Sequence, residues 1–250
     1  VGPDRAGPFG ILQTLADAIK LLLKEQILPS KADRAMYLLA PLIALVPSFL
    51  IFMIIPLGPD ITVEWQNSLY TIPLVGADLN VGVLYFLALS SIAVYSVVLA
   101  GWSSGSKYPL LGGVRASAQM ISYEAAMGLA LVPVILYSGS LSLVDIVNSQ
   151  SGNLSSSIPI LNTIVSFIPK WNIFPQFVAF GIFFIAAVAE VNRAPFDLVE
   201  AEQELVGGFH TEYSGFRFAM FFLAEYINMF NMCAITATFF LGGWLGPTFE

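Results

Sequence analysis

Two glutamates stand inside stretches that are otherwise apolar enough to cross a membrane. Glu124 follows Arg115 by nine residues, and Glu225 follows Arg217 by eight. At 1.5 Å per helical residue, both carboxylates are expected about 12–14 Å deeper than these arginines. An ionised carboxylate inside a span costs on the order of 3 kcal/mol, so such residues usually face a bundle interior and mark an ion or proton path. With Glu190, at the end of another apolar stretch, they form a candidate proton-handling set. The alternative is that each is half of a buried pair or of a helix–helix hydrogen bond, with no transport role.

A short acidic segment begins at Glu190. Six of the seventeen acids in the chain fall within 23 residues, and they are Glu190, Asp197, Glu200, Glu202, Glu204 and Glu212. Cytoplasmic loops of membrane proteins are enriched in Lys and Arg, so a separate requirement must keep this loop acidic. We interpret it as a funnel that exchanges protons with the buried glutamates. The alternative is a solvated loop that docks a basic partner.

The elements that position these acids are predicted to be membrane helices. The chain has 57% hydrophobic and 11% charged residues, whereas soluble domains carry about a quarter charged residues. A helix needs about 20 apolar residues to cross the bilayer, and helix satisfies the backbone in lipid. The sequence therefore predicts one all-α, polytopic membrane domain over residues 1–250. Its five transmembrane helices are expected at residues 36–56, 79–101, 115–137, 173–190 and 216–241, with the acidic loop at 191–215.

Basic residues predict the orientation of the bundle. Nine of the ten lie before the first span, between the second and third, or between the fourth and fifth, and only Lys170 lies on the other side. By the positive-inside rule, these nine face the cytoplasm or its equivalent. We expect the opposite segments, residues 58–78 and 138–172, to be external loops. One Cys and one His exclude an internal disulfide and a multi-histidine metal or haem site.

Residues 8–26 have the pattern of an amphipathic helix. Leu12, Leu15, Ile19 and Leu22 share one face, and the opposite stripe carries Gln13, Asp17, Lys20 and Lys24. The segment is too short and too charged to span, so we expect it in the membrane interface. It is either an ordinary anchor or a helix whose polar stripe lines a lateral opening from the bilayer.

Three segments resemble the signatures of one known family. AEVNRAPFDL at 189–198, followed by EYSG at 212–215, resembles the signature of the H subunit (mitochondrial subunit 1) of proton-pumping NADH:quinone oxidoreductase, respiratory complex I. SKYPLLGGVR at 106–115 with SYE at 122–124 is similar to the second signature of this family. GPDR at 2–5 and GPFG at 7–10, with the polar stripe that follows, resemble its interfacial-helix signature. The three motifs occur in the family's order and cover nearly the whole chain.

The resemblance implies a membrane subunit that forms a quinone-access chamber with partners from the hydrophilic arm. It implies small membrane subunits and antiporter-like pump subunits as further partners, an energy-transducing membrane, such as the bacterial cytoplasmic (inner) membrane, as the location, and no nucleic acid. Quinone is the implied substrate; this chain binds no cofactor, and the iron–sulfur cluster and flavin belong to partner subunits. The implied quinone-channel residues are Arg5, Asp17, Arg193, Phe196, Phe209, Phe216 and Arg217. The implied proton-coupling residues are Glu124, Glu190, Asp197, Glu200, Glu202, Glu204, Glu212 and Glu225.

Two departures and several competing readings accompany this interpretation. The family usually has Pro where Val199 stands, and it has further transmembrane helices before and after the region that matches residues 1–250, so we expect flanking helices. A homologous subunit of a membrane-bound hydrogenase without quinone would share the fold and the acids. A free-standing proton-coupled transporter and a purely structural anchor are two further possibilities.

Overall fold

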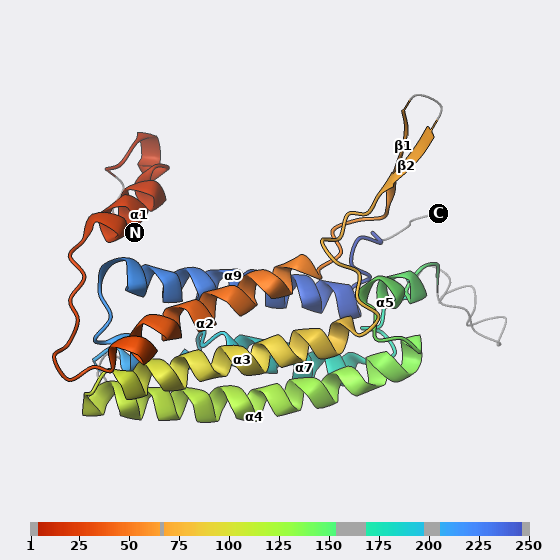
Figure 1. The fold of residues 1–250 in the computed structure, drawn as a ribbon. Coiled ribbons are helices and arrows are strands. Elements are labelled where there is room, and N and C mark those ends of the chain that lie inside the picture. Colours follow the sequence, from red (N-terminus) through yellow and green to blue (C-terminus); the bar gives the residue numbers. More distant parts are fainter. Residues whose placement is uncertain (1–4, 66–67, 154–168, 198–205, 247–250) are drawn as a thin grey trace.

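The computed structural model describes residues 5–65, 68–153, 169–197 and 206–246. Within these ranges, four helices are long and apolar enough to cross a membrane: α2 (Arg34–Met53), α3 (Gly82–Ser103), α4 (Lys107–Ser138) and α9 (Gly215–Phe240). They lie lengthwise beside one another with the shorter apolar helix α7 (Phe177–Glu190) (Figure 1). The predicted fold class, a polytopic helical membrane protein, is confirmed.

The structure differs from the expected spans mainly at α4 and α7. Helix α4 begins at Lys107, eight residues before the expected start, because Pro109 falls in its first turn, where a missing N–H costs nothing. Helix α7 has 14 residues and begins at Phe177 rather than at 173. The residues before it form a turn fixed by Asn172, whose Nδ2 donates to the backbone oxygen of Phe239 over 2.8 Å. At about 21 Å, α7 is shorter than the hydrocarbon core.

Glycines set the closest helix contacts. A Cβ on Gly101 of α3 would lie 2.5 Å from the backbone oxygen of Pro109 on α4, and one on Gly113 would lie 3.0 Å from the oxygen of Val97. Close approach through small residues is typical of packing in membranes. This contact fixes the end of α3 against the start of α4.

The segments outside the bundle contain elements that the sequence pattern had not predicted. The expected external loop at 58–78 contains an antiparallel hairpin of β1 (Ile61–Trp65) and β2 (Ser68–Ile72), and the segment 138–172 contains the short helix α5 (Leu143–Ser149). At the other end of the bundle, the amphipathic segment divides into η1 (Pro8–Gly10) and α1 (Gln13–Leu23). Figure 1 shows α1 and the hairpin at opposite ends of the molecule.

The interior holds two apolar clusters. One contains Phe86, Met127, Leu131, Phe183 and Phe239; the other contains Tyr37, Ala40, Met120, Phe209 and Tyr213. Along α2, α3, α4 and α9, the residues between these clusters include buried or half-buried polar side chains. Large apolar side chains on the outer surface of the helices are exposed, among them Leu42, Phe49, Leu129, Leu136 and Phe184. A bilayer would cover such a surface.

Candidate functional site

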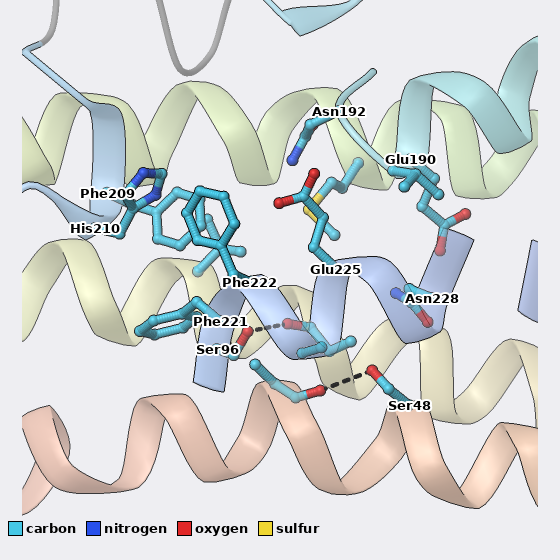
Figure 2. A pocket seen from close by; sticks show the side chains of 16 residues that line it. Ser48, Ser96, Glu190, Asn192, Phe209, His210, Phe221, Phe222, Glu225 and Asn228 are labelled. Carbon is cyan, nitrogen blue, oxygen red and sulfur yellow. Dashed lines mark hydrogen bonds between the residues drawn. The ribbon is translucent and has the colours of Figure 1, made fainter. Parts of the chain in front are cut away.

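A cavity of about 70 Å³ lies in the polar layer between the two clusters. Its walls come from α2, α3, α4, α7, η3 (Gly208–His210) and α9, and they include the carboxylates of Glu190 and Glu225. The polar part of the lining is completed by Ser48, Ser96, Asn192, His210 and Asn228 (Figure 2). A polar cavity needs roughly 10–15 Å³ of such volume to hold a water molecule, so this one has room for water.

Serines on α3 hold two of the acids. Ser90 donates a hydrogen bond to Glu190 Oε1, and its neighbour Ser91 donates one to Glu124 Oε1. Glu190 is buried, and its second oxygen has no hydrogen-bond partner among the described residues. Two consecutive residues of one helix thus hold carboxylates from α7 and α4. Neither carboxylate faces a permanent cation in these contacts.

Glu225 has a different environment. Its Oε1 lies 3.2 Å from Nη2 of Arg193, and the same guanidinium lies 5.0 Å from the ring centre of Tyr226. The pair is only partly enclosed, since the Arg193 side chain is 41% exposed. A half-exposed ion pair contributes little to stability, roughly 0–1 kcal/mol. The same carboxylate lines the cavity, so the ion pair does not isolate it from the polar layer.

Aromatic side chains close the cavity on the side of the second cluster. His210 packs against the rings of Phe209, Phe218 and Phe222, and Phe209 also contacts Phe221 edge-on. Burial lowers the pKa of His210 to about 4. The imidazole is therefore neutral at physiological pH, and it adds a polar group without a charge.

A second group of contacts joins the N-terminal segment to the start of α9. The rings of Tyr37 and Tyr213 stack with centres 4.1 Å apart, and Arg217 lies 5.5 Å from the ring centre of Tyr37. Tyr37 donates to the backbone oxygen of Glu212 over 2.7 Å, and burial raises the pKa of Tyr213. The backbone N–H of Ile27 donates to Ser214 Oγ over 3.0 Å. The segment after α1 therefore lies beside the start of α9.

The predicted site residues fall into distinct places. The cavity is lined by Glu190, Glu225 and Phe209, and Arg193 pairs with Glu225. Glu124 accepts a hydrogen bond from Ser91, next to the serine that binds Glu190. Phe196 contacts Tyr123, and Asp197 is exposed. Phe216 and Arg217 lie in the first turn of α9, and Glu212 precedes that helix. Arg5 and Asp17 are exposed in the N-terminal segment, where Asp17 accepts from Gln13. Glu200, Glu202 and Glu204 lie outside the described residues.

Sequence reasoning missed several residues that the structure brings to these acids: Ser90, Ser91, Gln119, Asn192 and His210. A Ser-Ser pair in the middle of an apolar span was a usable signal, because polar residues there tend to bond across helices. The signature containing Asn192 also marked its position. Nothing in the pattern around Gln119 indicated which helix it would face.

No group of three or more His, Cys, Asp or Glu residues that could hold a metal ion occurs in the part of the chain that the structure describes. The titratable groups that line the cavity are two carboxylates and one imidazole, with amide side chains between them. These groups are suited to holding and moving protons in a polar layer.

Comparison with known proteins agrees with the signatures. A family model described as NADH dehydrogenase matches residues 1–249. The NADH-quinone oxidoreductase H subunit numbered 2 in Geobacter metallireducens is 54% identical over 260 residues, with 100% of this chain and 69% of the relative covered. The H subunit numbered 1 in Geobacter sulfurreducens is 53% identical, with the same coverage, and that of Frankia alni is 52% identical over 249 residues, covering 99% of this chain and 50% of the relative. The chain belongs to the family of the H subunit of NADH-quinone oxidoreductase, a multi-pass membrane subunit of complex I.

Proposed function

We propose that this subunit couples quinone reduction to proton translocation through the carboxylates of its polar layer, and that its N-terminal segment and the start of α9 border the quinone-access chamber. The partners are the hydrophilic-arm subunits at the chamber, the small membrane subunits and the antiporter-like pump subunits. The membrane is an energy-transducing one, the bacterial cytoplasmic membrane. Quinone is the substrate of the complex, and the iron–sulfur cluster and flavin are in partner subunits.

The proposal has a coupling half, the proton translocation, and a quinone half, the access chamber. The observation that carries the coupling half is the cavity with Glu190 and Glu225 in its walls. Carboxylates from two different elements face one small space that has room for water. Unpaired buried oxygens on Glu190 and Asn228 support hydration of this space, because buried polar atoms normally find a partner. Glu124 extends the set through Ser91. Such a set is suited to passing a proton when the charge of the acidic loop changes.

The quinone half rests on the contact between two segments distant in sequence. The connection after α1 lies against Ser214 and Gly215, where a Cβ on Gly215 would lie 3.0 Å from the backbone oxygen of Lys24. Phe216 and Arg217 follow directly in α9, and Phe216 is 43% exposed. An amphipathic helix beside an exposed aromatic and a cation suits the rim of an opening for an amphipathic substrate.

Replacement of single acids in the intact complex tests the coupling half. We expect Glu225→Gln, Glu190→Gln and Glu124→Gln each to lower the number of protons translocated per NADH oxidised, because an amide cannot carry the exchanged proton. Proton uptake into sealed vesicles and NADH oxidation are measured on the same preparation. Glu64→Gln is the matched control, because Glu64 is exposed on the hairpin. Wild-type electron transfer and proton stoichiometry in Glu225→Gln and Glu124→Gln would overturn the assignment.

A further inference from the structure

Gln119 of α4 meets three oxygen atoms at the start of the acidic loop. Its Nε2 lies 3.1 Å from the backbone oxygen of Ala189, 3.0 Å from that of Phe196 and 3.2 Å from Oδ1 of Asn192. Backbone oxygens only accept, so the amide nitrogen of Gln119 is the atom that faces them. The amide has two hydrogens and three acceptors. These contacts therefore compete for the same two donors.

The two backbone acceptors place Gln119 at the end of α7. The carbonyl of Ala189 is one of the last four of that helix, which lack a partner four residues further on. The backbone N–H of Asn192 also reaches this carbonyl, over 3.3 Å, so Gln119 supplies an additional donor one residue before Glu190. The carbonyl of Phe196 belongs to the loop, and the ring of Phe196 packs edge-on against Tyr123 of the same helix α4, with centres 5.3 Å apart. Residues 189–196 are thus held on α4.

The third acceptor connects Gln119 to the cavity. Asn192 has φ 51°, a left-handed conformation that Asn tolerates better than most residues. Its Oδ1 is engaged by Gln119, which leaves its amide nitrogen for the opposite side. In Figure 2 that nitrogen points toward the carboxylate of Glu225. Asn192 lines the cavity together with Glu190 and Glu225.

We propose that Gln119 is a positioning residue of the coupling site: it fixes the turn after α7 and orients Asn192 so that the Asn192 amide nitrogen faces Glu225. This inference rests on the proposed function. It assigns to α4 a second contribution beside Glu124. Movement of the acidic loop would redistribute the two Gln119 hydrogens among the three oxygens, and Asn192 would turn with them. Gln119 itself exchanges no proton with the acids.

Amide hydrogen exchange in the intact complex tests the contacts themselves. We expect Gln119→Met, which keeps the length but removes the donor, to speed exchange in the peptide covering residues 189–197 about ten-fold, because about two hydrogen bonds are lost. Gln176→Met is the matched control. Gln176 Nε2 donates over 3.2 Å to the backbone oxygen of Pro133, between the same two helices at their other end. Unchanged exchange in Gln119→Met would overturn the proposal.

The proton yield tests the role. We expect Gln119→Met and Asn192→Gly, which suits the positive φ, each to lower the protons translocated per NADH, and the double variant to lower them no further. A multiplied loss, or a wild-type yield in Gln119→Met, would overturn the positioning role. If Gln119→Met keeps the wild-type proton yield while Glu225→Gln lowers it, the positioning role of Gln119 is wrong and the proposed function still stands. Should Gln119→Met fail to assemble, the same measurements on Gln119→Asn decide, since its amide stops one carbon short.

Discussion

At the residue scale, the three acids on the membrane helices, buried Glu190 and half-buried Glu124 and Glu225, differ in what holds them. Serine hydroxyls bind Glu124 and Glu190, whereas Arg193 binds Glu225. A hydroxyl can donate to a charged carboxylate or accept from a protonated one, so it accommodates both states. A guanidinium only donates and favours the charged form. The proton occupancy of Glu225 is therefore tied to the position of Arg193, which sits at the start of the acidic loop.

His210 gives a prediction at the same scale. Burial among phenylalanine rings lowers its pKa to about 4, whereas an unfolded imidazole has a pKa of about 6.5. As pH falls, the unfolded state therefore binds the proton first. The stability that the neutral, buried imidazole contributes to the folded state is complete above pH 6.5 and is lost progressively between pH 6.5 and 4. The loss is on the order of 3 kcal/mol at its limit. We expect His210→Phe to reduce the acid sensitivity of the complex.

The measurement is the thermal inactivation midpoint of wild type and His210→Phe across this pH range. Because His210 is the one histidine of the chain, the difference between the two curves isolates its contribution from that of the carboxylates. The gap should open below pH 6.5 in favour of the variant. Parallel curves from pH 7 to pH 4 would contradict the buried, neutral state of this imidazole.

At the element scale, α4 holds both halves of the acidic loop. Gln119 and Tyr123 contact its start, and Gly112 contacts its second half, where a Cβ would lie 2.7 Å from the backbone carbon of Gly208. A helix that carries Glu124 thereby touches the loop at two points. Displacement of the loop at either point would therefore change its contacts with α4.

Gly112→Ala tests this arrangement. Its methyl group would meet backbone atoms that have no side chain to move aside, so we expect a loss of roughly 1–3 kcal/mol in stability and a displaced loop end. Gly128→Ala on the same helix is the matched control, because its Cβ would meet only Leu87 Cδ1 at 4.0 Å. There the higher helix propensity of Ala should be neutral or stabilising by up to about 1 kcal/mol.

Thermal stability of the purified complex and limited proteolysis within residues 198–207 check this prediction together. Gly112→Ala should lower the midpoint and speed cleavage, and Gly128→Ala should do neither. Equal behaviour of the two variants would mean that the contact with Gly208 does not hold the loop.

The elements show what the sequence could and could not predict. Membrane helices were predictable because a helix satisfies the backbone hydrogen bonds of an apolar segment in lipid. The hairpin was missed, although Ile61, Val63 and Trp65 alternate with polar residues as strands do. The early start of α4 was missed because Lys107 and Pro109 interrupt the apolar pattern. The contact of Gln119 with the end of α7 depends on how two helices pack, and no local pattern carries that information.

The candidate site shows the same division. The acids were predictable individually, since a carboxylate in an apolar span is conspicuous. Their grouping was not: Glu190 and Glu225 share a cavity, while Glu124 reaches the set through Ser91. The pairing of Glu225 with Arg193 joins residues 32 positions apart in sequence, and it became apparent only from the packing of α9 beside the loop.

At the scale of the whole molecule, the polar layer lies between two apolar clusters, so its cavity is bounded on both sides along the helices. The loop side is bounded by His210 and its aromatic neighbours. Under the proposed function, a charge change on that side would act on the acids of the layer through Arg193, which pairs with Glu225, and through Asn192, which lines the cavity.

Under the proposed function, quinone enters beside α1 and approaches the polar layer from its loop side. We therefore expect a photoreactive quinone analogue, applied to the intact complex in membranes, to label peptides within residues 209–217 and 13–24, because these segments adjoin at the start of α9. Peptides from the hairpin at residues 61–72, at the other end of the bundle, serve as the internal control (Figure 1). Labelling that an excess of quinone suppresses at 209–217, and not at 61–72, supports the access route. Equal labelling at both ends would place the analogue in bulk lipid and remove the quinone half of the proposed function, while the proton yields of the glutamate variants would still decide the coupling half.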